Sequence, residues 1–131
     1  MGWSDVLNAT IARKQRILEQ GSRQAALGLT QAIIVKTPVD TGRARGNWNT
    51  NIGAPDTTTS DTKRANDALN DANSTASSLK LGDTFTIYNG LPYIQKLEYG
   101  YSQQAPQGMV RLSVMEFKQL LRVYFNVKST G

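Results

Sequence analysis

The feature that most constrains this chain is a long stretch of helix-compatible sequence that ends at Pro38. No proline occurs before this position, and apolar residues recur at spacings of four and seven, which places them on one helical face. They are Leu7, Ile11, Leu18, Ala25, Leu29 and Ile33. The pattern predicts a helix from about Ser4 to Lys36, roughly 50 Å long at 1.5 Å per residue. Ser4 is its expected N-cap, and Gly21 is the expected place for a bend.

A turn is predicted directly after this helix. Thr37 precedes a proline and therefore favours extended geometry, which ends the helix. Asp40, Thr41 and Gly42 supply turn residues, because Asp hydrogen-bonds the local backbone and Gly accepts a positive φ. We therefore expect Pro38, Asp40, Thr41 and Gly42 to form the hinge between helix and sheet.

The segment after the hinge alternates large polar and small residues from Arg43 to Asn51, which predicts a strand. Trp48 is the strong core candidate in this strand. The polar stretch from Gly53 to Ser78 then lacks apolar periodicity and is rich in residues that compete with helix formation. We expect it to be a long insertion with little regular structure, in which residues 63–72 can form a short helical turn.

Three further elements are predicted toward the C terminus. Residues Leu81 to Asn89 alternate in the manner of a strand, and Asn89 with the following glycine is a turn signal. Pro92 suits the first position of a short helix. From Met109 to Val127, apolar residues at spacings of three and four predict a second amphipathic helix.

Together these elements predict an α+β fold. In it, a long N-terminal helix and a C-terminal helix pack on a small, mainly antiparallel β-sheet with a long polar insertion. The chain has 131 residues, which is the usual size of one domain. We therefore expect a single domain over residues 1–131, with a flexible insertion at about 53–78 and a frayed tail at 128–131.

The composition argues against most catalytic chemistry. The chain has no Cys and no His, which removes thiolate nucleophiles, histidine bases and nearly all zinc sites. No phosphate-binding loop or nucleophile motif is present, and no pair of carboxylates shows a spacing that predicts proximity. We therefore predict a protein that is not an enzyme and holds no cofactor. No apolar stretch is long enough for a membrane span, and we expect no membrane partner.

The net charge is +5 and the pI is about 9.7, which favours anionic partners. Much of the basic excess lies on the first helix, at Arg13, Lys14, Arg16 and Arg23. These residues lie mostly off the apolar stripe. They form either a solvated basic face or a surface that contacts an acidic partner or DNA.

Arg43 and Arg45, together with Trp48, also allow two interpretations. Arginine binds phosphate and tryptophan stacks on bases, so the segment can be a nucleic-acid-binding strand. Alternatively, Trp48 belongs to the core and the arginines flank a solvated edge strand, where charge discourages edge pairing. Lys63 and Arg64 are further candidates for contacts with DNA or a neighbouring subunit.

Tyrosines are concentrated in a short part of the sequence, at Tyr88, Tyr93, Tyr99 and Tyr101. Tyrosine is enriched where an apolar surface meets a polar rim. Core packing accounts for one or two of these side chains. Four within fourteen residues predict a subunit interface.

Two stretches, TPVDTGRARGNWNT and IYNGLPYIQKLEYGYSQQAPQGMVRLSV, resemble the tail-component proteins of long-tailed double-stranded DNA bacteriophages. This family includes the lambda minor tail protein Z type and the neck or tail-completion proteins of related phages. The matching positions are Pro38 to Gly42, Arg43, Arg45, Trp48, Asn89, Pro92, Tyr93, Glu98, Tyr99, Gly100, Gln104 to Pro106 and Gly108 to Arg111. Ala44, Gln95 and Lys96 depart from the family pattern.

The resemblance implies a structural protein of the virion, assembled in the cytoplasm of the host bacterium. Such a protein would form a ring of itself, in six or twelve copies, at the junction between head and tail. Its expected neighbours are the head connector or head-closure protein, the tail terminator or tail tube protein, and double-stranded DNA passing through the lumen. The alternatives are a tail terminator ring or a small basic DNA-binding accessory protein. The ring interface is expected to include Pro92, Tyr93, Glu98, Tyr99, Tyr101 and Arg111.

Overall fold

The computed structural model describes residues 2–39, 42–99 and 108–116. Helix α1 spans Trp3–Lys36, which confirms the predicted long helix. The helix continues through Gly21 without interruption. Its N-cap is Gly2, whose backbone N–H donates to Asp5 Oδ2 at 3.2 Å, so Ser4 lies inside the helix and is not the cap. Asp5 therefore supports the first turn, as acidic residues at helix N-termini do.

The predicted strand from Arg43 begins too early. Gly42 adopts a left-handed φ of 72°, and the chain then makes the short helix α2, Arg43–Gly46. Asn47 stabilises this turn, because its Nδ2 donates to the Arg43 carbonyl oxygen at 2.8 Å. Local bonding by Asn thus favours a helical turn over an extended strand. Of the predicted hinge, Asp40 and Thr41 lie outside the described residues.

The sheet consists of two antiparallel strands, β1 (Trp48–Ile52) and β2 (Phe85–Asn89). In this register Trp48 faces Asn89 and Ile52 faces Phe85. The strand predicted from Leu81 therefore starts four residues later. The reason is a turn in which the Lys80 N–H donates to Asp83 Oδ2 at 2.8 Å and the Asp83 N–H donates to the Lys80 carbonyl oxygen at 3.0 Å.

The largest correction concerns the polar insertion, which contains the helix α3, Ala65–Ser77. Asp67 caps it by accepting a hydrogen bond from the Arg64 backbone N–H at 2.8 Å. Its buried face consists of alanines spaced by four residues: Ala68, Ala72 and Ala76. The expectation that this segment would have little regular structure is wrong, because alanine provides a helical face without bulky apolar side chains.

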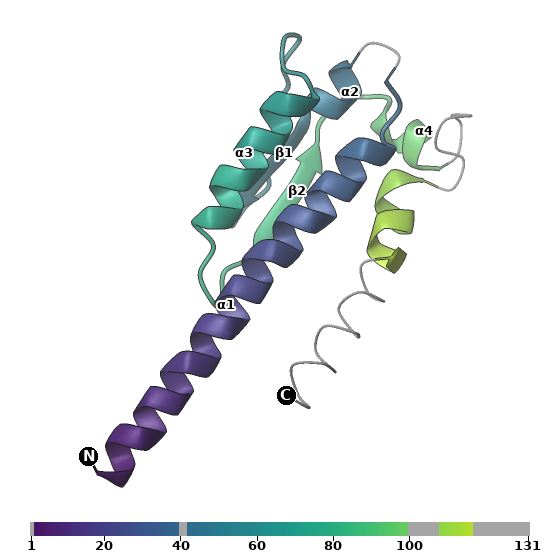
Figure 1. Cartoon of the computed structure of the whole chain (residues 1–131). Helices are drawn as coiled ribbons and strands as arrows, with labels where there is room; N and C mark the ends of the chain where they lie inside the picture. Colours follow the sequence, from purple (N-terminus) through teal and green to yellow (C-terminus); the bar gives the residue numbers. More distant parts are fainter. Residues whose placement is uncertain (1, 40–41, 100–107, 117–131) are drawn as a thin grey trace.

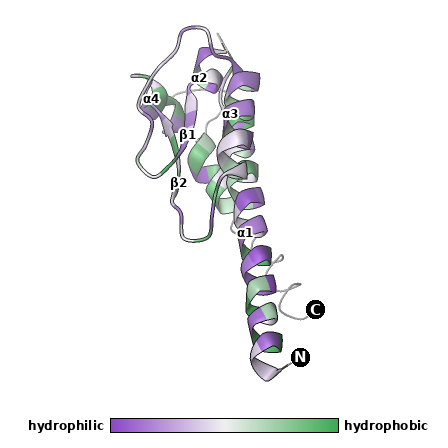
Figure 2. Cartoon of the chain, turned by 90° about the vertical axis from the view of Figure 1, so that its left-hand side faces the viewer, coloured by the Kyte–Doolittle hydropathy of each residue, from purple (hydrophilic) through white to green (hydrophobic). Residues whose placement is uncertain are grey.

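The helices α1 and α3 lie side by side over one face of the sheet (Figures 1 and 2). The core between these layers is formed by Ile33, Ile34, Trp48, Ala68 and Met109. Small alanine side chains let α3 approach α1 and β1 closely. The predicted α+β architecture, with a long N-terminal helix and a small antiparallel sheet, is confirmed.

After the sheet, a turn leads into the short helix α4, Ile94–Glu98. The predicted start at Pro92 is two residues early, since the Ile94 N–H is the first to close a turn, with the Leu91 carbonyl oxygen at 3.2 Å. Residues 109–116 are helical, in agreement with the first part of the predicted C-terminal helix. The rest of that prediction, through Val127, lies outside the described residues.

The N-terminal half of α1 extends beyond the other described elements (Figure 2). Among the described residues, the hydrogen bonds from α1 to other segments that lie furthest toward its N terminus are at Arg23 and Glu19. Arg23 Nε donates to the Leu79 carbonyl oxygen at 2.7 Å, and Glu19 accepts from the Leu81 N–H at 3.3 Å. The buried residues of α1 all lie after these points, from Thr30 onward. No helix within the described residues combines the length and apolar character that a membrane crossing requires.

Candidate functional site

The motif after α1 forms a compact hydrogen-bonded cluster around the end of that helix. Arg45 Nε donates to the Thr37 carbonyl oxygen at 2.6 Å, and Arg45 Nη2 donates to the Val35 carbonyl oxygen at 2.7 Å. These carbonyls belong to the end of a helix, where they have no intrahelical partner. A cation at this end also opposes the negative pole of the helix dipole. Arg45 therefore serves as a C-terminal cap of α1.

We expect Arg45→Ala to lower the free energy of unfolding by about 1.5–3 kcal/mol, because it removes hydrogen bonds from a charged donor to helix carbonyls. Urea unfolding followed by circular dichroism measures this change. Arg45→Lys is the matched control, since it keeps the charge and loses the forked geometry. It should recover only part of the stability. A change below 0.5 kcal/mol for Arg45→Ala would contradict the capping role.

Trp48 completes this cluster from the core side. Its side chain is 5% exposed, and its indole Nε1 donates to Thr37 Oγ1 at 2.9 Å. The Thr37 hydroxyl in turn donates to the Ile33 carbonyl oxygen at 2.7 Å. The interpretation of Trp48 as a core residue is therefore confirmed. A buried indole with its N–H satisfied is not available to stack on a base.

The other predicted cations gather around α2 and contact acceptors of the chain itself. Arg43 Nη2 lies 2.9 Å from Asp61 Oδ1, and Lys63 Nζ pairs with Asp71. Arg64 Nη1 donates to the carbonyl oxygens of Asp61 and Lys63 at 3.1 and 3.0 Å. The fold thus brings Arg43 and Asp61 together from different segments, whereas the contacts of Lys63 and Arg64 are local. Their contacts with DNA or with a neighbouring subunit stay predictions.

Three asparagines hold the segments of this region together, and of these only Asn89 was singled out from the sequence, as a turn residue and a motif position. Asn47 exchanges hydrogen bonds with Ser60, at 2.8 Å through Nδ2 and at 2.7 Å through Oδ1. Asn49 Nδ2 donates to the carbonyl oxygens of Asp56 and Thr58 at 3.0 and 2.6 Å. The available signal was the repeated Asn in a predicted strand, where this residue is disfavoured unless its amide has a partner.

The third asparagine, Asn89, connects the two motif-bearing stretches. Its Nδ2 donates to the Ala44 carbonyl oxygen at 2.9 Å, and its Oδ1 accepts from the Leu91 N–H at 3.1 Å. The side chain is 7% exposed. A buried amide with both groups satisfied fixes the end of β2 against α2.

Glu98 connects α4 to the helical residues 109–116. Its carboxylate accepts from the backbone N–H groups of Val110 at 2.8 Å and Arg111 at 2.9 Å. Arg111 Nε also donates to Glu98 Oε1 at 3.1 Å, and its Nη2 donates to the Glu98 carbonyl oxygen. The Arg111 guanidinium lies 5.0 Å from the centroid of the Tyr99 ring, within range for a cation–π contact. Glu98 therefore caps this helix from outside.

We expect Glu98→Gln to expose the amides of Val110 and Arg111 to faster hydrogen exchange and to lower stability by about 1–2 kcal/mol. Hydrogen exchange resolved at single residues measures the local effect. Glu116→Gln is a suitable control, because its carboxylate is 53% exposed in its ion pair with Lys36 and such pairs contribute little. Equal effects of the two variants would argue against the cap.

The predicted interface residues differ in exposure. Tyr99 is 65% exposed and Pro92 is also exposed, whereas Tyr93 is half-buried. The Glu98 side chain is 15% exposed, consistent with its contacts inside the chain. Tyr101 lies outside the described residues. The fold therefore brings Glu98, Tyr99 and Arg111 together, with the tyrosine ring turned toward solvent.

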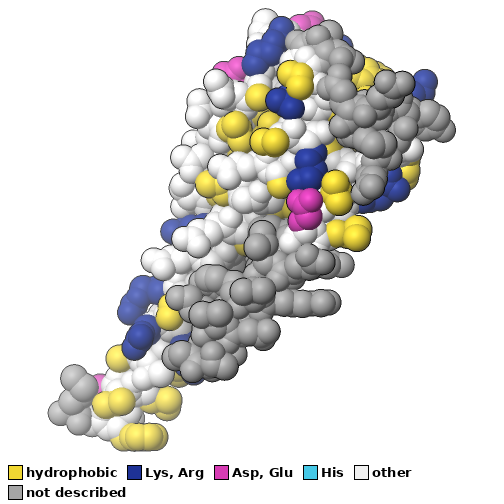
Figure 3. All heavy atoms as spheres, turned by 45° about the vertical axis from the view of Figure 1, so that its right-hand side comes forward, with side chains coloured by type: hydrophobic (Ala, Val, Ile, Leu, Met, Phe, Trp, Pro, Cys, Tyr) yellow, Lys and Arg dark blue, Asp and Glu magenta, His cyan; other side chains and the backbone are white. Residues whose placement is uncertain are grey.

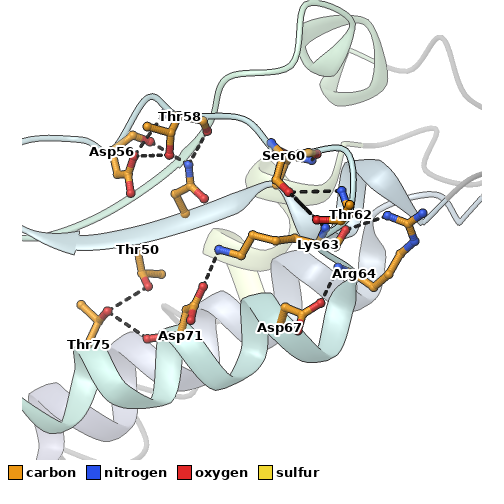
Figure 4. Close-up of polar contacts among 12 residues, drawn as sticks. Thr50, Asp56, Thr58, Ser60, Thr62, Lys63, Arg64, Asp67, Asp71 and Thr75 are labelled. Atoms are coloured by element: carbon orange, nitrogen blue, oxygen red, sulfur yellow. Dashed lines mark hydrogen bonds and ion pairs between the residues drawn. The ribbon is translucent and has the colours of Figure 1, made fainter.

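An open cleft of about 240 Å³ lies between β1, α3 and the segment that joins them (Figure 4). It is lined by Asn49, Thr50, Asp56, Lys63, Asp71, Ser74 and Thr75. The Thr50 hydroxyl donates a hydrogen bond to the Thr75 hydroxyl at 3.1 Å across it. The Thr58 hydroxyl and, to a lesser extent, the Thr58 backbone N–H donate hydrogen bonds to Asp56, and these bonds hold the pKa of Asp56 below its usual value. Asp56 is therefore a carboxylate at neutral pH.

The charged side chains that line this cleft are engaged with neighbouring groups of the chain. Lys63 and Asp71 neutralise each other, and the Asp56 carboxylate is engaged by Thr58. A general base or nucleophile needs a partner that activates it. Within the described ranges, no three potential ligands of the His, Cys, Asp and Glu type gather to hold a metal ion. The absence of enzymatic activity stays a prediction.

Comparison with protein-family models finds no match for this chain. Searches of curated proteins and of solved structures find no significant match either. The resemblance to phage tail components therefore rests on the motifs alone.

Proposed function

We propose that this chain is a structural virion protein of a tailed bacteriophage, forming a ring at the head-to-tail junction that joins the head connector to the tail and lets DNA pass. The observation that carries the proposal is the mutual contact of the resembling motifs. Asn89 of the second stretch bonds Ala44 of the first, and within the second stretch Glu98 bonds Arg111. Residues that form one framework are expected to recur together in a family.

A ring of identical subunits requires a surface that contacts a different surface of the next copy. The exposed Tyr99 ring beside Arg111 and the exposed Pro92 supply a candidate for one side of that contact. Tyrosine and arginine are enriched at the centres of interfaces. We place the ring contact around α4 for this reason.

The alternative of a DNA-binding accessory protein is less well supported by the site. Arg45 binds the end of α1, Trp48 is buried, and Arg43 is paired with Asp61. DNA binding by the isolated protein at physiological salt, with submicromolar affinity that Arg43→Ala abolishes, would favour this alternative. Weak, salt-sensitive binding is the result expected for a subunit whose ring has not formed.

The decisive experiment is electron cryomicroscopy of the head-to-tail junction of virions that carry this chain. We expect a closed ring with the α4 surface at the subunit boundary. Tyr99→Ala should prevent incorporation while changing the free energy of unfolding by no more than about 1 kcal/mol. Tyr88→Ala, on a tyrosine that is 39% exposed on β2, is the matched control. A chain absent from the virion, or present there as a monomer, would refute the proposal.

A further inference from the structure

The projecting part of α1, residues 3–18, is called the arm below. It carries apolar side chains that no described element covers. Trp3 is 80% exposed, Leu7 48%, Ile11 47% and Leu18 45%. Their spacing of four, four and seven places them on one face of the helix. Figure 3 shows hydrophobic side chains along this projecting end, with Lys and Arg side chains beside them.

A helix of this length in water gains most of its stability from packing of its apolar face. The apolar face of the arm therefore lacks a packing partner among the described elements. Contiguous apolar surfaces on soluble proteins commonly mark interaction sites. Something of matching length is expected to cover it.

Residues 117–131 are by themselves too short to cover the whole arm. Lys36 lies five helical turns after Leu18 and so shares its face of α1, and Lys36 Nζ binds Glu116 at 2.9 Å. Residues 117–131 number 15. Even as a continuous helix they span about 22 Å, which from Lys36 reaches back to about Gly21. One or two further turns, for the reach of the two side chains, still leave Ile11 and Leu7 uncovered.

The area required also indicates a partner as long as the arm. A specific interface buries at least about 1,000 Å² in total, or about 500 Å² on each side. A tryptophan side chain offers about 150–250 Å², so Trp3 alone is insufficient. The half-exposed Leu7, Ile11 and Leu18 must be covered as well. The partner must therefore present an elongated apolar surface.

We propose that the arm of a second copy of this chain is that partner, packed antiparallel about a two-fold axis. The residues on this face, Leu7, Ile11, Lys14 and Leu18, have spacings of four, three and four. This order reads the same in both directions. In an antiparallel pair, Leu7 of one copy therefore lies beside Leu18 of the other, as a two-fold contact requires.

The same register also keeps the charge of Lys14, which lies on this face, in contact with solvent. Lys14 lies beside Ile11 of the other copy, where its aliphatic stem packs and its ammonium reaches solvent. A parallel pair would instead place the two Lys14 side chains directly against each other, which is unfavourable. In the same register, Trp3 lies beside Ser22 of the other copy.

This contact does not rest on the proposed ring. The arm lies at the opposite end of α1 from α4 (Figure 1), so the two surfaces are separate. Ile11→Asp tests the arm alone, and Tyr99→Ala tests the α4 surface alone. Failure of one proposal is therefore distinguishable from failure of the other.

Sedimentation velocity of the full chain from about 1 to 100 µM tests the proposal. We expect a reversible dimer with twice the 14.4 kDa mass of the chain. Ile11→Asp should shift it to monomer by at least tenfold in dissociation constant. Ala9→Asp adds the same charge on the opposite side of the arm and should leave the dimer intact. A monomer throughout this range, or a dimer that survives Ile11→Asp, would overturn the proposal.

Cysteine cross-linking tests the orientation, because the chain has no Cys of its own. Oxidation of a mixture of Leu7→Cys and Leu18→Cys chains should give a disulfide between the two variants. Leu18→Cys alone should not cross-link. Efficient cross-linking of Leu18→Cys with itself would indicate a parallel pair and contradict the register.

Discussion

Gly46→Ala is expected to destabilise the fold by about 3 kcal/mol or more, a large share of the total for a small domain. A Cβ at this position would lie 2.0 Å from the Lys63 carbonyl oxygen and 2.6 Å from the Arg64 backbone nitrogen. Both are backbone atoms that lead into α3. They can move away only if α3 separates from α2, so the clash has no inexpensive relief. Urea unfolding followed by circular dichroism measures the loss.

This result opposes the expectation from helix propensity. Gly46 ends the helix α2, and replacing a helical Gly by Ala ordinarily stabilises by about 0.5–1 kcal/mol. Gly53→Ala is the control, because a Cβ there meets no atom within 4 Å and only the positive φ of 100° opposes it. Its effect should be about 1–2 kcal/mol. Unchanged or raised stability in Gly46→Ala would show that α3 does not pack against this glycine.

Trp48→Ala is expected to lower the free energy of unfolding by about 3–5 kcal/mol, because it empties the centre of the core. The Trp48 indole contacts the layer formed by Ile33, Ile34 and Ala68 and also holds Thr37 by its hydrogen bond. Trp48→Phe retains an aromatic ring and removes the donor. We expect this variant to fall between the wild type and the alanine variant.

A double-mutant cycle isolates the hydrogen bond in this cluster. Thr37→Val removes the hydroxyl that accepts from Trp48 Nε1, and it keeps the branched shape. Combined with Trp48→Phe, it should show a coupling energy of about 0.5–1.5 kcal/mol. Strict additivity of the two changes would mean that the indole N–H contributes nothing beyond packing.

The long helix and the small sheet were predictable because their signals are local. Apolar spacing defines α1, Pro38 ends it, and alternation defines β2. The predicted core position of Trp48 is also confirmed. It was predictable because a single large aromatic residue in a polar segment has few other stable places. These elements follow from periodicity within a few consecutive turns or residue pairs.

The elements that were missed depend on contacts between distant segments. The helix α3 packs through alanines, which carry little hydropathy signal but allow close approach to α1 and β1. The turn α2 replaces part of the predicted strand because Asn47 bonds both Arg43 and Ser60. Neither partner is recognisable before the chain is folded.

The contacts of the candidate site were only partly predictable from the sequence. Glu98, Tyr99 and Arg111 lie together in the fold, and their part in a ring interface stays a prediction. The sequence could not show that the Glu98 carboxylate caps residues 109–116, because the cap lies twelve residues away along the chain from the N–H of Val110. Likewise, the role of Arg45 depends on the position of the α1 carbonyls in space.

The placement of α3 between the two strands has a consequence for the order of folding. The strands β1 and β2 pair directly, yet Gly53 to Thr84 separate them along the chain, and closing so long a loop is entropically unfavourable. If α3 docks on α1 first, the two strand segments are brought close before they pair. In that order the strands pair only after the alanine face of α3 has docked on α1.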